Sequence, residues 1–171
     1  MLQSSSDITV SGLELVGPNS TGYGVHVQNS DRITLANNDL TGHLVGVRVE
    51  NGSDLVVQGN DVSGTPEHGV QISGPISGSL TVVNNDLSGV GTGFALAVDA
   101  NALTALAMSG NHLHNASSGV LTDNATIDLD FSAQDFSNSG TNNTKTALWL
   151  RWPIDVTVTG VRGDCENIGQ L

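Results

Sequence analysis

The feature that most constrains this chain is an internal repeat of about 24 residues. A short strand-like segment recurs seven times, and each copy is too short to bury an apolar face by itself. Successive repeats must therefore stack on one another. The seven segments are Ile8-Thr9-Val10, Ile33-Thr34-Leu35, Leu55-Val56-Val57, Leu80-Thr81-Val82, Leu106-Ala107-Met108, Leu129-Asp130-Phe131 and Ile154-Asp155-Val156.

An asparagine follows this segment at the same position in four of the repeats. The four residues are Asn38, Asn60, Asn85 and Asn111. Asparagine tolerates the sharp bends between strands, and its amide group both donates and accepts hydrogen bonds. We therefore predict a ladder of asparagine side chains that bridges neighbouring coils.

Each repeat contains a second strand that opens on glycine, as in Gly24-Val25-His26-Val27 and Gly93-Phe94-Ala95-Leu96. The chain has 21 glycines and only 4% aromatic residues. This composition disfavours helices and supports strands and turns. Coils of three short strands, each pairing with its counterpart one coil above, predict a parallel β-helix.

The charge of the chain limits its partners. Acidic residues outnumber basic ones by 17 to 5, which gives a net charge of −12 at pH 7. Neutralisation of phosphates is therefore disfavoured, and we expect no nucleic-acid partner. No apolar run is long enough for a membrane span, and residues 1–6 do not resemble a signal peptide, so we expect no membrane partner.

The patterns Gly-Val-x-Val, Ser-Asp-x-Ile-Thr-Leu and Asn-Asn-Asp-Leu resemble the right-handed parallel β-helix repeats of the pectate-lyase-like superfamily, over about residues 6–163. The resemblance implies an all-β fold, a single-stranded right-handed parallel β-helix of about seven coils with three short strands per coil. We expect residues 1–171 to form one β-helix domain. Lyases, hydrolases, epimerases, phage tailspikes and non-enzymatic proteins share this repeat, so activity stays open.

Strand alternation predicts two outward-facing rows on the glycine-led strands. The first row is His26, Arg48, Gln71, Ala95, Leu121 and Trp149, and the second is Gln28, Glu50, Ser73, Ala97, Asp123 and Arg151. In the resembled family, sugar clefts lie against this strand and its flanking turns. The cleft residues implied here are Tyr23, His26, His43, Arg48, Glu50, Glu67, His68 and Gln71, with Trp149 as a sugar-stacking ring.

If the chain is an enzyme, the resemblance implies a polysaccharide lyase or a uronate C5-epimerase. Arg48 would bind or neutralise a uronate carboxylate, and a neutral His26 or His68 would take the C5 proton. Tyr23 would donate a proton to the leaving oxygen. The alternative is that these four residues are ordinary polar side chains of a solvated sheet, with Arg48 paired to Glu50.

The segment Thr65-Pro66-Glu67-His68 is similar to the Asp-Pro-His-Glu motif of alginate C5-epimerases. Only Pro66 is in register, because Thr65 replaces the leading acid and Glu67 and His68 are transposed. No catalytic role is carried over from this motif.

Three acids follow the recurrent asparagine, and they would stack about 4.8 Å apart on the outside of one turn. They are Asp39, Asp61 and Asp86. Repulsion between them could be relieved by calcium, which prefers oxygen ligands, or by solvation alone. The chain requires no cofactor on this interpretation, and calcium is the ion that the turn would bind.

Two functions remain open from the sequence. The first is an extracellular or particle-surface module that binds or processes a polysaccharide, and the second is a non-catalytic structural or adhesive stalk. We see no capping helix before Ile8 or after the last strand. Open strand edges pair with other chains, so we expect end-to-end self-association or the remainder of a longer chain at the tips.

Overall fold

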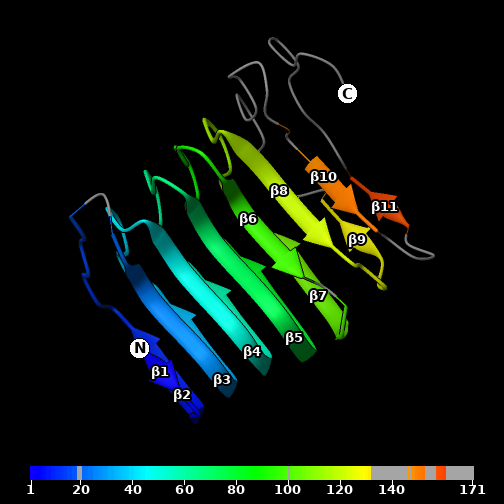
Figure 1. The fold of residues 1–171 in the computed structure, drawn as a ribbon, viewed down its shortest axis with the longest axis horizontal. Coiled ribbons are helices and arrows are strands. Elements are labelled where there is room, and N and C mark those ends of the chain that lie inside the picture. The colour runs from blue at the N-terminus through cyan, green and yellow to red at the C-terminus, as the bar shows by residue number, and fades with distance from the viewer. Residues whose placement is uncertain (19–20, 100, 132–145, 147, 153–156, 161–171) are drawn as a thin grey trace.

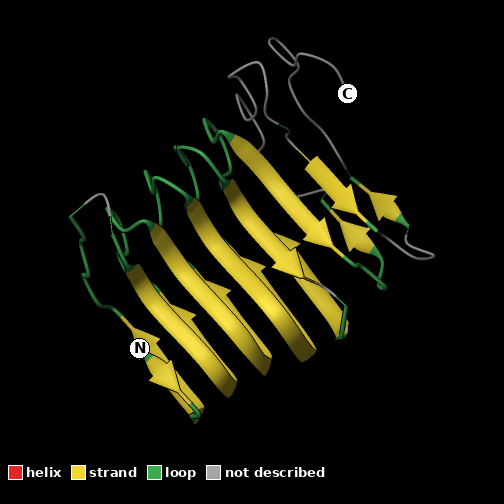
Figure 2. Cartoon of the chain, in the orientation of Figure 1, coloured by secondary structure: helices red, strands yellow, loops and turns green. Residues whose placement is uncertain are grey.

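The computed structural model shows a right-handed parallel β-solenoid, as predicted. The structure describes residues 1–18, 21–99, 101–131, 146, 148–152 and 157–160. Within these ranges the regular elements are strands, and no helix is long and apolar enough to cross a membrane (Figure 2). Strands from successive coils lie side by side along one axis, which gives the molecule a layered shape (Figure 1).

One parallel sheet, called the first face here, follows the whole length of the described solenoid. Its strand order is β1-β3-β4-β5-β6-β8-β10, with every neighbouring pair parallel. It consists of β1 (Leu2–Gln3), β6 (Phe94–Asp99), β8 (Ser118–Asp123), β10 (Leu148–Arg151) and the first halves of β3 (Tyr23–Ala36), β4 (Val45–Gln58) and β5 (His68–Val83).

A second face is formed by the strands that contain the repeated segment. It comprises β2 (Ser6–Ser11), the second halves of β3, β4 and β5, and β7 (Leu103–Ser109), with β9 (Leu129–Asp130) and β11 (Val158–Thr159) as a separate pair. In β3, β4 and β5 the two predicted strands of a coil run together into one bent element. Left-handed backbone conformations make the bends, with φ of 49° at Asn29 and 53° at Arg32 in β3.

The third face is narrower than expected, because isolated bridges replace a third strand. Successive bridges join Glu14 to Asp39, Asp39 to Asp61, Asp61 to Asp86, and Asp86 to His112. The described residues therefore show about five complete turns, fewer than the seven predicted. The segment Ile154-Asp155-Val156 lies outside the described residues, and Leu129 pairs with Val158 rather than with that segment.

The register of β6 also differs from the prediction. Gln71 pairs with Ala97 rather than with Ala95, and Asp99 rather than Ala97 pairs with Asp123. The reason is that Gly93 is not the counterpart of Gly69. The Gly93 N–H instead donates to the Glu67 carbonyl at 2.8 Å. The residue of β6 that corresponds to Gly69 is therefore Ala95, two residues after Gly93.

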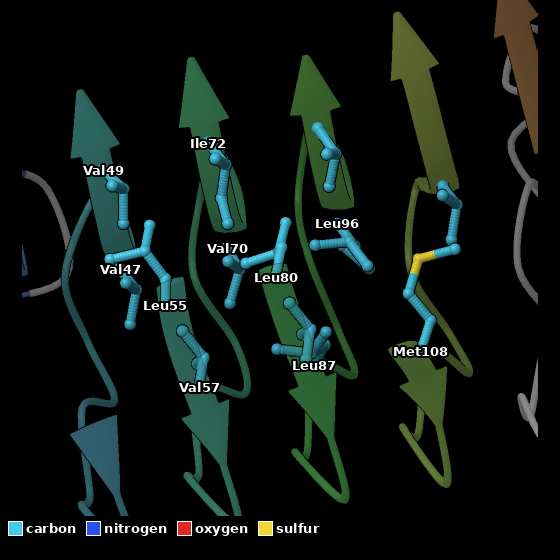
Figure 3. Close-up of a cluster of buried hydrophobic side chains, with 14 of the residues drawn as sticks. Val47, Val49, Leu55, Val57, Val70, Ile72, Leu80, Leu87, Leu96 and Met108 are labelled. Carbon is cyan, nitrogen blue, oxygen red and sulfur yellow. The ribbon is translucent and has the colours of Figure 1, made fainter. Parts of the chain in front are cut away.

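Apolar side chains from the three faces meet in a continuous buried core along the axis (Figure 3). Val47 and Val70 are stacked in register on the first face, opposite Val57 and Leu80 of the second face. All four are buried. Because each coil contributes the same few positions, aliphatic residues of similar size fill the core in layers.

The asparagine ladder is present and buried, as predicted. The Asn38 Nδ2 group donates to Asn60 Oδ1 at 2.9 Å, and the Asn60 and Asn85 amides donate onward in the same way at 3.0 and 2.9 Å. Each Nδ2 also donates to a carbonyl oxygen of a neighbouring strand, such as Leu35 for Asn60. The side chains therefore satisfy backbone groups where the chain turns out of the second face.

Candidate functional site

A connected group of polar side chains lies on the solvent side of the first face. The strand register places His26, Arg48 and Gln71 in one row on β3, β4 and β5. Gln28 and Glu50 occupy the adjacent row two residues further along the strands. Alternation puts these side chains outside because valines at the intervening positions fill the core.

Glu50 is the centre of this group. Its carboxylate accepts hydrogen bonds from Arg48 Nε at 2.7 Å and from Gln28 Nε2 at 3.2 Å. His26 Nε2 lies 3.3 Å from the same carboxylate. A second arm of the Arg48 guanidinium donates to the Gln71 side-chain oxygen. The group thus links three coils through side-chain contacts.

Tyr23 covers one end of this group at the start of β3. Its ring is edge-on to the His26 imidazole at a centroid distance of 5.0 Å, and the Arg48 Cζ atom lies 5.7 Å from the ring centroid. Tyr23 as a whole is 42% exposed. The structure therefore brings together five of the eight predicted cleft residues, namely Tyr23, His26, Arg48, Glu50 and Gln71.

The charge state of Glu50 follows from its partners. Its hydrogen bond to the Arg48 guanidinium lowers the pKa of the carboxyl, and partial burial opposes this change. The carboxylate is therefore ionised at neutral pH. Arg48 faces a fixed negative charge, while its second arm is held by an amide oxygen.

His68 lies apart from this polar group. Its position on β5 corresponds to that of Tyr23 on β3, two coils further along the solenoid. The Phe94 N–H donates to His68 Nδ1 at 3.0 Å, and the same nitrogen lies 3.4 Å from the Phe94 carbonyl oxygen. Burial lowers the pKa of the imidazole, which favours the neutral ring. The His68 ring stacks on Phe94 at 6.4 Å with an interplanar angle of 8°.

Aromatic rings continue along the axis beyond His68. The ring centroids of Phe94 and Trp149 are 6.1 Å apart, and Trp149, on β10, is 48% exposed. Trp152, 66% exposed, stacks against Arg151, and the Arg151 guanidinium also pairs with Asp123. The first face thus carries a polar group at β3–β5 and an aromatic group at β6–β10.

Two predicted cleft residues lie in the turns that precede the first face. His43 Nε2 is hydrogen-bonded to the Leu15 carbonyl at 2.6 Å, which ties two neighbouring turns together. Glu67 is half-buried, and its backbone N–H donates to the Leu44 carbonyl at 3.0 Å. Both residues therefore border the face at its turn-side edge.

The three stacked acids form tight turns on the third face. Asp61 Oδ1 accepts the Ser63 N–H at 3.0 Å, and Asp86 Oδ1 accepts the Ser88 N–H at the same distance. Asp39 makes the equivalent contact with Thr41. Across the described ranges, His, Cys, Asp and Glu side chains form no group of three or more that could hold a metal ion. Calcium binding by this column stays a prediction.

Gln28 and Phe94 belong to the site but are not among the residues predicted for it. Gln28 was recognisable as the neighbour of Glu50 in the second outward row. Phe94 was assigned to the wrong register position because Gly93 looked like the usual strand-opening glycine. Its contacts with His68 and Trp149 depend on that register.

The fold and its outward rows define a parallel β-solenoid with a polar and aromatic face. A family model described as the right handed beta helix region matches residues 1–136. The chain belongs to this family. It matches none of the curated proteins and none of the solved structures with which it was compared.

Proposed function

We propose that this protein is an extracellular or particle-surface module that binds a polysaccharide along the first face. The observation that carries the proposal is one outward register row that runs from His26, Arg48 and Gln71 to Trp149, with the Tyr23 ring packed against His26. Coils repeat about every 4.8 Å, which is close to the repeat of an extended sugar chain. Consecutive sugars can therefore meet equivalent positions on consecutive coils.

Binding is favoured over catalysis because the candidate catalytic side chains already make contacts within the protein. His26 Nε2 already contacts Glu50, and His68 Nδ1 is occupied by the Phe94 N–H. Arg48 makes both of its contacts within the protein. A general base needs hydrogen-bond access to the proton that it removes. These contacts would have to break before a reaction of the lyase or epimerase type could begin.

The experiment is a titration of the 171-residue protein with a panel of oligosaccharides, followed by calorimetry, with and without calcium. We expect binding by the wild type and about tenfold weaker binding by Trp149→Ala and Tyr23→Ala, because exposed aromatic anchors dominate such surfaces. Thr34→Ala is the matched control, since Thr34 faces outward on the second face. It should bind like the wild type.

The second candidate is a non-catalytic structural stalk, favoured by the ladder that joins successive coils through Asn38, Asn60 and Asn85. A stalk would bind no oligosaccharide of the panel. Catalysis is checked in the same samples, because a lyase generates unsaturated chain ends and an epimerase exchanges the C5 hydrogen with solvent deuterium. Either product would replace the binding proposal by an enzymatic one.

A further inference from the structure

The first face contains no free positive charge among its described residues. The guanidinium of Arg48 is paired with Glu50, and that of Arg151 is paired with Asp123. The other arginine that the structure describes, Arg32, lies at the bend towards the second face and forms two hydrogen bonds with Asp7, at 2.6 and 2.8 Å. Each described arginine therefore already has a carboxylate partner.

Acids outnumber arginines on the same surface. Glu50, Asp99 and Asp123 lie in the outward rows, against two arginines, and Asp99 pairs in register with Asp123. The chain as a whole has a net charge of −12. A carboxylate brought to this face would meet like charges and would have to compete with Glu50 for Arg48.

The groups that remain suit an uncharged sugar. The Gln28 side-chain oxygen and the Gln71 side-chain nitrogen make no hydrogen bond within the described part of the chain, although each amide is held through its other atom. A sugar hydroxyl can serve such groups as donor or acceptor. Trp149 and Tyr23 add exposed rings that can stack on the C–H face of a pyranose without any charge.

We infer that the first face selects neutral polysaccharides over uronate-containing ones. This inference rests on the proposed function and names its ligand class. Glu50 is the residue that sets the selectivity, because it neutralises Arg48 and contacts His26 and Gln28 at the same time. It acts as a specificity-determining residue by holding Arg48, the arginine of the polar group, away from an acidic sugar.

The test compares neutral hexasaccharides of glucose, mannose and xylose with oligogalacturonate and oligomannuronate of the same length. We expect the wild type to bind at least one neutral chain about tenfold more tightly than either acidic chain. Binding of the neutral chain should change less than about twofold between roughly 50 and 500 mM salt, because no net ion pair forms.

The Glu50→Gln variant tests whether Glu50 causes the preference for neutral chains. Removing the carboxylate leaves Arg48 uncompensated, so affinity for the acidic chains should rise about tenfold and become salt-dependent. Glu14→Gln is the matched control, because it removes the same charge from the exposed third face. It should leave the preference of the wild type unchanged. Circular dichroism verifies that both variants keep the strand spectrum.

The outcomes separate the two proposals. Tighter binding of an acidic chain by the wild type overturns the inference and leaves polysaccharide binding intact. No increase for folded Glu50→Gln overturns the role assigned to Glu50 and with it the inference. Failure of the wild type to bind any chain of either class overturns the proposed function, and the inference falls with it.

Discussion

At the scale of single residues, the buried asparagines are the clearest case of a sequence position whose role is fixed by hydrogen bonding. Asn60 donates to Asn85 and to the Leu35 carbonyl, and its Oδ1 accepts from Asn38. We expect Asn60→Ala and Asn85→Ala each to lower the free energy of unfolding by about 1–3 kcal/mol, because buried partners lose their hydrogen bonds. Urea unfolding followed by circular dichroism measures the loss.

Asn101→Ala is the control for this prediction, because Asn101 lies exposed in the turn before β7. Its unfolding midpoint should stay near that of the wild type. Unchanged midpoints for both ladder variants would remove the claim that the ladder stabilises the solenoid.

His68 makes stability depend on pH. Burial lowers the pKa of its imidazole from the ordinary value of 6.5. The unfolded chain therefore binds this proton more readily than the folded chain, so stability is full above pH 6.5 and decreases as the pH falls towards the folded pKa. Urea unfolding at about pH 7.5 and about pH 5.5 should show a smaller acid-induced loss for His68→Gln than for the wild type.

His112→Gln controls for removal of a histidine elsewhere, because His112 is exposed on the third face. Equal acid-induced losses in the wild type and in His68→Gln would contradict the assignment to His68.

Residue types and their spacing predicted most of the polar group, and they offered the pair of Arg48 and Glu50 as one of two interpretations. The alternation of β3 and β4 was sufficient to place His26, Arg48 and Glu50 on one surface. The partners of Arg48 depend on side-chain reach along its own strand, to Glu50, and across to the next coil, to Gln71. Sequence alone did not determine these side-chain contacts. It also did not show that His68 lies apart from His26.

At the scale of elements, the strand assignments followed from period-two alternation, whereas the register of β6 did not. Gly69 and Gly93 both open an apolar run, but Gly93 lies two residues before the true counterpart of Gly69, which is Ala95. A glycine signals that a backbone approaches closely, and at Gly93 the neighbour is the Glu67 carbonyl. The sequence contains no signal that distinguishes a glycine at the start of a paired strand, such as Gly69, from a glycine in the turn before it, such as Gly93.

The turns between elements use left-handed residues in columns, and this arrangement gives a third prediction. Gly59 has φ +62°, and an added Cβ would lie 2.5 Å from Asn37 Oδ1 of the coil below. Gly64 has φ +67° with open space around its Cβ position. Alanine at position 64 should therefore cost only the backbone strain, about 1–2 kcal/mol. Alanine at position 59 adds a steric clash.

Thermal or urea unfolding of Gly59→Ala and Gly64→Ala measures the two costs side by side. We expect Gly59→Ala to be the less stable variant by about 1 kcal/mol or more, because Asn37 must move. Equal stabilities would show that the Asn37 side chain adapts without cost and that backbone conformation alone determines these turns.

At the scale of the whole molecule, the stacking principle predicted the solenoid, while the number of coils was overestimated. The five complete turns are those whose third-face residues form bridges, from Glu14 to His112. Beyond them, β8 and β10 continue the first face, and β9 and β11 form a separate pair. The second-face segment recurs even where the third-face turn lacks its asparagine and acid, so the sequence has more repeats than the solenoid has complete turns.

The N-terminal tip of the stack exposes apolar side chains. Leu13 occupies the position that asparagine has in the next four coils, and its N–H donates to Asn38 Oδ1 at 3.1 Å. Leu13 is 44% exposed and Val16 is 60% exposed. Among the described strands, β2 pairs with β3 on one side only. An apolar tip beside an unpaired strand edge is the arrangement that promotes pairing with another chain.

We propose that this tip associates with a second copy of the chain, and we expect the apparent mass in light scattering at moderate salt to rise with protein concentration. Leu13→Asp and Val16→Asp should shift the protein towards the monomer, because each places a carboxylate in the apolar contact. Thr81→Asp adds the same charge on the solvent side of the second face in the middle of the solenoid, where β5 is paired on both sides, and should associate like the wild type. A wild-type protein that stays monomeric over a wide concentration range, with slowly exchanging amides in β1 and β2, would contradict the proposal, because the first coil would then be stable without any partner.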